Sequence, residues 1–475
     1  MRGKKAETAK TMTFGKAVFV FAFVIAALLT VTVGLGGPAH IAMLLAAVMA
    51  GIVAVTSGFS WDELQEGIGD TIKAAVPAIL ILLAIGVIIG VWLLGGIVPT
   101  MIYYGLKILS PSIFLVASCL ICAVIATATG SSWSTVGTIG VALMGVGSGL
   151  SVPAGLTAGA IISGSYFGDK MSPLSDTTNL APAMAGTDIF THIRHMIYTT
   201  GPSFVIALIL YTVIGFKFAG NNFDSTLVEL YTSTLAGTFY ISPIMLIPPV
   251  LVIVMVIKKV PALPGLLAVA VLGCLFGVIF QGAAPQDMIS SAFSGFSVQT
   301  GVAEVDKLLN RGGMTSMMEI ICLILISLSF AGIVEKSGMV SVVIEKALKN
   351  AKKDSTVISV TLLSTIFTNF ATGVQYVALI IPGRMFKDIY RERGLHPKNL
   401  SRALEDTGTL CAPFVPWGTD AAFLSGVLGV TVGIYAPFCF LNFINPIVSL
   451  ICAQTGWTIE RIEPERVITQ PDKKE

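Results

Sequence analysis

Long apolar runs separated by short polar segments dominate the chain. A helix that crosses a bilayer needs about 20 mainly apolar residues. Backbone in lipid has to form its hydrogen bonds internally, so each run is predicted to be a helix. The runs lie near residues 17–36, 39–57, 74–97, 112–128, 133–150, 154–188, 196–216, 240–257, 263–280, 317–334, 355–371, 374–386, 404–430 and 433–453.

Two of these runs are interrupted by polar residues and helix breakers. The stretches 168–181 and 411–419 contain Gly, Pro, Ser, Thr and Asp in the middle of an otherwise apolar segment. Irregular backbone at membrane depth is tolerated only where it is buried in protein or lines a water-filled cavity. Both stretches are therefore predicted to be broken helices beside a cavity.

The order of short motifs suggests an internal duplication. Ala128-Thr129-Gly130 recurs as Ala371-Thr372-Gly373, and Pro173 and Pro416 lie at the same separation, each inside an interrupted run. The predicted fold is all-α, with two repeats of about five transmembrane helices, each with a re-entrant helical hairpin at the A-T-G motif and an interrupted helix. Tandem repeats with an odd number of crossings have to be inverted in the membrane.

The distribution of charge predicts the domains and their orientation. Lys and Arg gather in segments that a cytoplasmic amino terminus would place inside, whereas Lys107, Lys217, Lys307 and Arg311 fall outside. By the positive-inside rule, both termini are cytoplasmic. The predicted domains are a basic cytoplasmic tail (1–16), the first repeat (17–216), an extracytoplasmic linker (217–239), the second repeat (240–453) and a cytoplasmic tail (454–475).

Composition excludes most other classes of protein. Only 12% of the 475 residues are charged and 54% are hydrophobic, with a mean hydropathy of +0.86. A soluble chain carries roughly 25% charged residues. A net charge of +2 gives no general field for nucleic acid, so none is expected as a partner. The sequence predicts a multi-pass protein whose main partner is the lipid bilayer.

Ionisable groups inside a membrane are costly, which makes each of them a candidate functional residue. The first interrupted run combines two carboxylates, a lysine and several neutral oxygens: Asp169, Lys170, Ser172, Asp176, Thr177, Thr178 and Asn179. The second contributes Glu405, Asp406, Thr409 and Asp420. The predicted hairpin tips add Ser131 and Ser132 in one repeat and Asn369, Thr372, Gln375 and Tyr376 in the other.

This set of side chains is rich in oxygen and poor in sulfur and histidine, which suits Na⁺ or H⁺ rather than a transition metal. A broken helix would add free carbonyl groups for a cation. One carboxylate can hold a proton or Na⁺ but not both, and this is the simplest physical basis for exchange. No cofactor is expected, because Walker-type and common hydrolase motifs are absent from the sequence.

Structural roles for the same residues stay open at this point. Lys170 could form an ion pair with Asp169, and Asp176 and Asp420 could cap the helices that follow the breaks. Glu405 and Asp406 could lie near the surface in water. The four histidines, His40, His192, His195 and His396, fall in predicted loops and are expected at the surface.

A longer pattern resembles a known family. Gly130-Ser131-Ser132-Trp133, followed by Gly164–Asn179 (GSYFGDKMSPLSDTTN), is similar to the signature of the NhaC family of Na⁺/H⁺ antiporters, and the likeness runs through roughly 17–455. The resemblance implies antiport on an inverted-repeat fold in the inner membrane, with Na⁺ held mainly at Asp169 and Asp176. It implies further cation or proton ligands at Asp406, Asp420, Ser131, Ser132, Ser172, Thr372 and Thr409.

The expected activity is export of cytoplasmic Na⁺ in exchange for external H⁺. A related branch resembles malate–lactate antiporters, so exchange of small carboxylic acids with Na⁺ and H⁺ is the alternative, with Lys170 as a candidate partner of the acid. A cation channel and an intramembrane enzyme are the remaining alternatives. A homodimer is compatible with the resemblance, but the sequence identifies no interface.

Overall fold

The computed structural model describes residues 10–218, 225–258, 260–349 and 351–462. Within these ranges the chain is helical, and extended backbone contributes one isolated bridge, between Leu395 and Arg461. Seven helices in this part of the chain are long and apolar enough to cross a membrane, or up to nine spans if two bent helix pairs each count as one. The prediction of an all-α, multi-pass membrane protein is confirmed.

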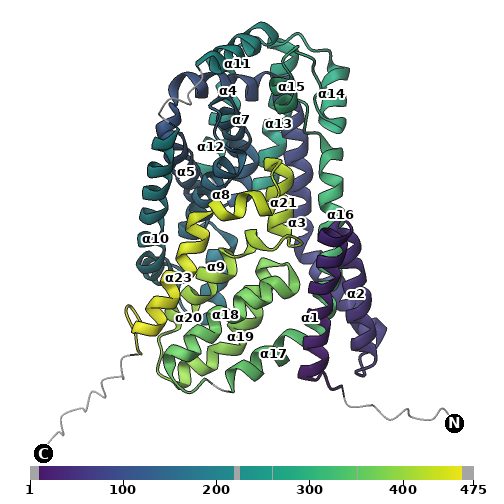
Figure 1. Ribbon diagram of the computed structural model, residues 1–475, viewed down its shortest axis with the longest axis vertical. Helices are drawn as coiled ribbons and strands as arrows, with labels where there is room; N and C mark the ends of the chain where they lie inside the picture. Colours follow the sequence, from purple (N-terminus) through teal and green to yellow (C-terminus); the bar gives the residue numbers. More distant parts are fainter. Residues whose placement is uncertain (1–9, 219–224, 259, 350, 463–475) are drawn as a thin grey trace, which may run out of the picture.

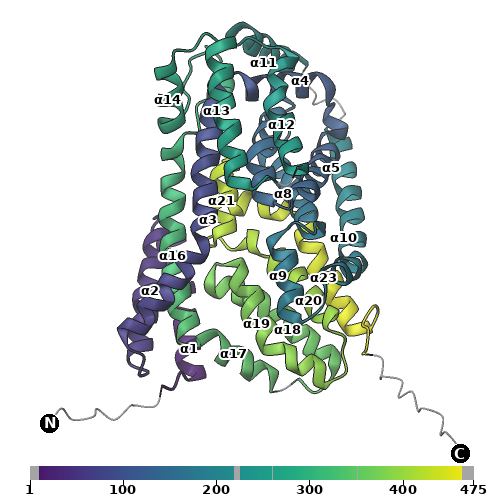
Figure 2. The same cartoon turned by 180° about the vertical axis from the view of Figure 1, so that it is seen from behind.

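One group of helices forms an elongated bundle that contains the first membrane span. Its members are α1 (Phe14–Leu28), α2 (Ala39–Val55), α3 (Trp61–Leu94), α13 (Ala262–Phe280) and α16 (Met318–Lys336). Helix α3 packs against α13 and α16, and α2 packs against α1 and α16. The long α3 stands beside α13 and α16 in both views (Figures 1 and 2).

Helix α3 begins earlier than its apolar run predicts. The run starts near residue 74, but the helix starts at Trp61 because Ser60 and Glu63 form a capping box. The Ser60 side chain accepts from the Glu63 backbone N–H at 3.3 Å, and Glu63 Oε2 accepts from the Ser60 N–H at 3.0 Å. Such reciprocal bonds satisfy two otherwise free donors, so the helix extends well beyond its apolar part.

A second group of helices contains the hairpins and the interrupted helices. Its main members are α5 (Pro111–Thr129), α8 (Ala154–Met171), α10 (Ile189–Lys217), α18 (Asp354–Thr372) and α23 (Phe440–Thr455). Shorter members are α4 (Ile97–Ile108), α6 (Ser132–Thr135), α7 (Val141–Gly149), α9 (Asp176–Ala185), α19 (Gln375–Glu392), α20 (Pro397–Leu404), α21 (Thr419–Leu428) and α22 (Val432–Tyr435). The remaining helices are α11 (Ser225–Thr238), α12 (Ile247–Ile257), α14 (Pro285–Ser294), α15 (Ala303–Leu309) and α17 (Met339–Leu348).

Each A-T-G motif forms the tip of a helical hairpin. Helix α5 ends at Gly130 (φ 66°) and α18 ends at Gly373 (φ 68°), both in the left-handed region that favours glycine. The hairpin of α5 and α7 lies in the half away from the termini, and that of α18 and α19 in the half that carries them (Figures 1 and 2). This is the arrangement that inverted repeats require; the repeat boundaries stay a prediction.

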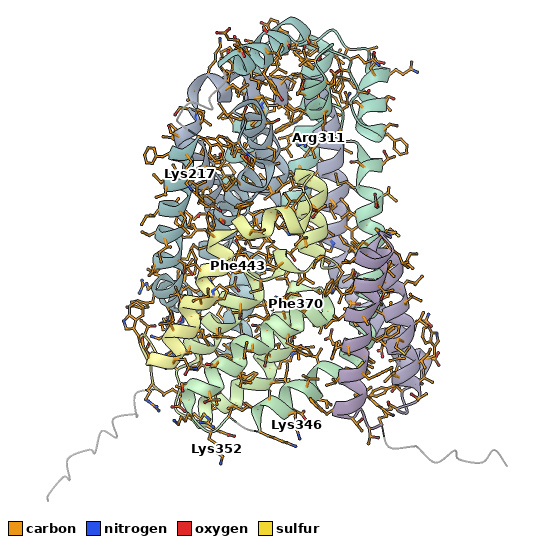
Figure 3. All side chains as sticks on the ribbon, viewed as in Figure 1. Lys217, Arg311, Lys346, Lys352, Phe370 and Phe443 are labelled. Carbon is orange, nitrogen blue, oxygen red and sulfur yellow. The ribbon has the colours of Figure 1, made fainter. Side chains whose placement is uncertain are left out.

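The two ends of the molecule differ in their basic residues. The start of α1 and the end of α23 lie at one end (Figure 1). Lys346 and Lys352 lie at that same end, whereas Lys217 and Arg311 lie in the other half (Figure 3). These positions agree with the sidedness that the sequence predicts for these four residues.

Three segments differ from the sequence-based expectations. The predicted linker 217–239 contains α11, and the next helical segment is bent by 96° relative to it. His192 and His195 lie inside α10 and are 0% and 2% exposed, so the prediction that they lie at the surface is wrong. The cause is the Asp188 cap, which starts α10 before its apolar run. The predicted tails lie partly outside the described residues, at 1–9 and 463–475.

We predict that the hairpin tip tolerates no side chain. A Cβ at Gly130 would lie 2.6 Å from the Leu174 carbonyl carbon, and an L-residue there would also adopt an unfavourable φ. Gly130→Ala should therefore destabilise the protein by on the order of 2 kcal/mol or more, measured as thermal unfolding in detergent. Gly433→Ala is the control, because its Cβ would meet nothing within 4 Å. Equal stability of the two variants would contradict this packing.

Candidate functional site

A cavity of about 1090 Å³ lies between the two groups of helices. One wall comes from α3, α12, α13 and α16, and the other from both hairpin tips and both interrupted helices. Its lining residues that carry charge or a hydroxyl include Asp70, Thr71, Ser131, Ser132, Ser134, Asp169, Ser175, Asp176, Thr177, Glu335, Lys336, Thr419 and Asp420. The two breaks that the sequence predicts beside a cavity do border one.

Asp169 stands at the end of the first half of the broken helix. It belongs to the last turn of α8 and is 8% exposed. Its Oδ2 accepts hydrogen bonds from the Ser132 backbone N–H at 3.0 Å and from the Ser132 hydroxyl at 2.6 Å. The first hairpin tip therefore holds one carboxylate oxygen, and the carboxylate borders the cavity.

Asp420 is the carboxylate that the second interrupted helix places at the cavity, after its break. It lies in the first turn of α21 and is 3% exposed. Its Oδ1 accepts from the Tyr166 hydroxyl at 2.7 Å and from Trp133 Nε1 at 3.2 Å, and its Oδ2 accepts from the Thr419 hydroxyl at 3.3 Å. Tyr166 and Trp133 belong to the first predicted repeat, so this carboxylate joins the two halves of the chain.

Asp176 borders the same cavity but has an exposed side chain. It is the first residue of α9, after the break. The cap of α9 is Ser175, whose hydroxyl accepts from the Thr178 N–H at 3.4 Å, so the interpretation of Asp176 as the cap is wrong. The cap of α21 is Gly418, so Asp420 does not cap that helix either.

The carbonyl groups at the first break already have partners. The Thr178 hydroxyl donates to the carbonyls of Asp169 at 3.2 Å and Lys170 at 3.0 Å. Asn179 Nδ2 donates to the carbonyl of Pro173 at 2.9 Å and to that of Ser175 at 2.7 Å. Each of these carbonyls therefore has a side-chain partner, and Thr178 and Asn179 stabilise the break.

Lys170 faces away from the cavity, although it follows Asp169 directly. Its Nζ forms an ion pair with Asp406 Oδ1, and both side chains are 0% exposed. The same Oδ1 accepts from the Thr199 hydroxyl at 3.0 Å and from Asn445 Nδ2 at 2.9 Å. The pairing of Lys170 with Asp169 is thus wrong as a structural interpretation; its partner comes from the second predicted repeat.

Glu405 and Asp406 belong to a π-helical turn, Glu405–Thr409, that is buried throughout. Both carboxylates are 0% exposed, which excludes the interpretation that they lie in water near the surface. Glu405 Oε1 accepts from the Thr177 hydroxyl at 3.1 Å, so the Thr177 side chain contacts this π-helical segment of the second predicted repeat. Thr409 is buried within the turn.

The other predicted ligands serve mainly as local supports. The Ser131 hydroxyl accepts from the Ser134 N–H at 3.1 Å and caps α6, and Ser131 also borders the cavity. The Ser172 hydroxyl accepts from the Leu174 N–H at 3.2 Å. The Thr372 hydroxyl donates to the Thr368 carbonyl at 2.7 Å. Of the predicted ligands, Asp169, Ser132 and Asp420 border the cavity and form hydrogen bonds with other helices.

Several residues that hold the site carboxylates were not predicted from the sequence. Trp133 and Tyr166 hold Asp420, and Thr199 and Asn445 hold Asp406. Asn445 could have been found, because it is an amide inside the apolar run 433–453 and polar groups in such runs need partners. Nothing in one sequence pairs Thr199 with a carboxylate 207 positions away.

The oxygen-rich surroundings suit a hard monovalent cation. In the part of the chain that the structure describes, no three His, Cys, Asp or Glu side chains come together to hold a transition or divalent metal. A cation at the cavity would meet carboxylate and hydroxyl oxygens, the ligands that hard cations prefer. The ion would be cargo, held at a place that both groups of helices border.

Helical hairpins, interrupted helices and buried carboxylates beside a cavity between two bundles define a secondary transporter. The chain matches the Na⁺/H⁺ antiporter family over residues 164–457. It belongs to that family, and the predictions of an antiporter and of the NhaC group are confirmed.

Relatives named for different transport activities align over nearly the whole chain. The chain is 40% identical to the malate-2H⁺/Na⁺-lactate antiporter of Bacillus subtilis (strain 168), over 94% of this chain and 95% of the relative. It is 36% identical to the Na⁺/H⁺ antiporter NhaC of Alkalihalophilus pseudofirmus, over 94% and 96%. It is 38% identical to the arginine/ornithine antiporter ArcD of Halobacterium salinarum, over 96% and 95%.

We predict that removing one partner of the buried ion pair Lys170–Asp406 destabilises the protein more than removing both. Lys170→Met leaves the Asp406 carboxylate buried without its counterion, which should cost roughly 3–5 kcal/mol. The double variant Lys170→Met/Asp406→Leu removes both charges and should recover part of that loss in a thermal unfolding experiment; recovery is incomplete because Thr199 and Asn445 lose their acceptor.

The control for this prediction is Lys336→Met. Lys336 Nζ lies 2.7 Å from Glu66 Oε2 in an ion pair that is partly open to solvent, and such pairs contribute little to stability. A double variant no more stable than Lys170→Met alone would show that the pair is not what couples these two positions.

Proposed function

We propose that this protein exchanges cytoplasmic Na⁺ for external H⁺ by alternating access. The observation that carries the proposal is the meeting of Asp169 and Asp420 at one cavity, each at a break in a membrane helix and each held by a hairpin tip or a neighbouring span. Desolvated carboxylates placed there can bind Na⁺ when ionised and lose it when protonated, so the two cations compete for the same oxygens.

Exchange of Na⁺ for H⁺ requires only a few carboxylates and the donors that hold them. Ser132 holds Asp169 Oδ2 through two donors, which leaves Oδ1 of that carboxylate to take Na⁺ or a proton. Asp176, on the cavity wall, lies where an incoming cation would first meet the second half of the broken helix. We assign Asp169 and Asp420 as the central carboxylates and Asp176 as a carboxylate of the access path.

The position of the cavity between two helix groups supports alternating access. It also borders Asp70 in the first half of α3 and Glu335 in the last turn of α16. Helix α16 leads into α17, which lies in the half that carries the termini (Figure 1). Rocking of one group of helices against the other would close this side and open the opposite one. In our proposal the protein lies in the inner membrane and this end faces the cytoplasm, as the basic residues predict.

A second candidate is exchange of small carboxylic acids together with Na⁺ and H⁺. It is favoured by the 40% identity to a relative named as a malate/lactate antiporter and by a cavity large enough for an organic molecule. Against it stands Lys170, the proposed partner of the acid, because that lysine is buried in a pair with Asp406 outside the cavity. Na⁺/H⁺ exchange is therefore our first proposal.

The test uses purified protein in sealed liposomes that contain a pH-sensitive dye. An imposed Na⁺ gradient should drive proton movement, and Asp169→Asn should reduce this flux at least tenfold, because an amide cannot exchange a proton for Na⁺. Asp188→Asn is the matched control: Asp188 is an exposed cap of α10, and asparagine caps equally well. Full activity of Asp169→Asn would contradict our assignment.

The same liposomes distinguish the two candidates. Malate and lactate, added without a change of Na⁺, should leave the internal pH unaffected if the protein exchanges only cations. Proton movement that requires malate or lactate would establish the second candidate and displace the first. Asp176→Asn should slow Na⁺-driven flux, and an unchanged rate would remove Asp176 from the access path.

A further inference from the structure

The cavity is far larger than a bare alkali ion requires. Its volume of about 1090 Å³ falls at the upper end of the range for sites that enclose drug-sized ligands. Much of its wall is apolar and comes from four different helices. The apolar residues that border it include Ile81 on α3, Val252 and Met255 on α12, Leu266 on α13 and Ile380 on α19. Such a wall offers nothing to Na⁺ but would stabilise a hydrocarbon group.

The charge of the lining has one dominant sign. Five carboxylates border the cavity, at Asp70, Asp169, Asp176, Glu335 and Asp420, and the single basic lining residue is Lys336. Lys336 is already paired with Glu66. A cavity lined by one sign of charge concentrates ligands of the opposite sign, so the occupant that fits these walls is a cation.

Two polar side chains on the wall have atoms without a partner among the described residues. Ser134 Oγ and Gln375 Nε2 form no hydrogen bond, although the side chains are only 6% and 8% exposed and both border the cavity. Buried polar atoms in native proteins are nearly always satisfied. The Ser134 hydroxyl can accept from a ligand N–H, whereas Gln375 Nε2 is a donor and needs an acceptor, so a ligand that satisfies both carries a polar group as well as its charge.

Aromatic rings stand beside the carboxylates. Trp133, which donates to Asp420, and Tyr376, at the second hairpin tip, both border the cavity. The faces of such rings attract organic cations, quaternary ammonium groups in particular. Acid, aromatic ring and apolar wall thus occur together in one partly open cavity.

We propose that this cavity also binds a small organic cation, with its charged end at Asp169 and Asp420 and its apolar part along α3, α12 and α13. The inference rests on the proposed function in one respect: the organic cation and Na⁺ share the same carboxylates and exclude each other. An acyl chain of phospholipid fits the apolar wall, but its phosphate group would meet five carboxylates, so we favour the cation.

The experiment measures binding of n-alkyltrimethylammonium ions to the purified protein by calorimetry. These ions keep their charge at every pH and carry no protons. From the methyl to the hexyl compound, affinity should rise roughly threefold for each methylene group that enters the apolar wall. Na⁺ should weaken the binding competitively. Hexanesulfonate, of similar length and opposite charge, should bind at least tenfold more weakly than hexyltrimethylammonium.

Matched variants locate the apolar wall. Ile81→Ala should reduce the affinity ratio of hexyl to methyl compound at least threefold, because Ile81 borders the cavity. Leu80→Ala, one position away, should leave the ratio unchanged, since Leu80 is 41% exposed and does not line the cavity. If Ile81→Ala does not fold, Ile380→Ala tests the same wall from α19.

Three results would overturn the proposal: affinity independent of chain length, equal binding of hexanesulfonate, or displacement of the hexyl compound by phospholipid but not by Na⁺. The proposed function is tested separately by Na⁺-driven proton flux. Binding that increases with chain length in a protein without such flux would support the organic-cation site and refute Na⁺/H⁺ exchange. Na⁺-driven proton flux in a protein that does not bind the alkylammonium ions would support Na⁺/H⁺ exchange and refute the organic-cation site.

Discussion

The requirement that every backbone polar group in a membrane has a protein partner governs this structure. Each break in a helix frees carbonyls that lipid cannot satisfy. Here side chains take them, from the following half-helix at the first break and from other segments at the second. Thr178 and Asn179 do so at the first break. At the second, Asn369 Nδ2 donates to the Gly408 carbonyl at 2.6 Å and Asn442 Nδ2 to the Leu410 carbonyl at 3.0 Å. The carboxylates and hydroxyls that border the cavity are the cation ligands that we propose.

The last turn of α8 places two consecutive residues in two different environments. Asp169 borders the cavity and is held by a hairpin tip, whereas Lys170 is enclosed and paired with Asp406. A shift of this turn cannot change one contact without straining the other. The buried pair also spans the two predicted repeats, and breaking it would leave a buried charge. Movement of the carboxylate during transport is therefore tied to the packing of the second interrupted helix.

Sequence patterns predicted most of the local structure of this protein. Both broken helices follow from polar residues inside apolar runs, and both hairpin tips from the repeated A-T-G. The same polar residues predict Asp169 and Asp176 as the main carboxylates, with Asp420 as a secondary ligand. The partners could not be predicted, because pairs such as Lys170 and Asp406 lie 236 positions apart and one sequence contains no information on distant contacts. The two histidines of α10 were misplaced for a local reason, since a cap at Asp188 extends the helix beyond its apolar run.

The burial of Lys170 in a pair with Asp406 leaves the lining of the cavity mainly acidic. Had this ammonium group faced the cavity, it would have offset one of the five carboxylates and offered an anion a direct partner. Its pairing with Asp406 leaves the lining carboxylates with one basic neighbour, Lys336, which Glu66 already engages. An anion entering this space would meet repulsion from Asp169, Asp176 and Asp420 unless it carried protons with it. In our proposal, selection for cations thus arises from a contact outside the cavity, in the buried pair that joins the two halves of the chain.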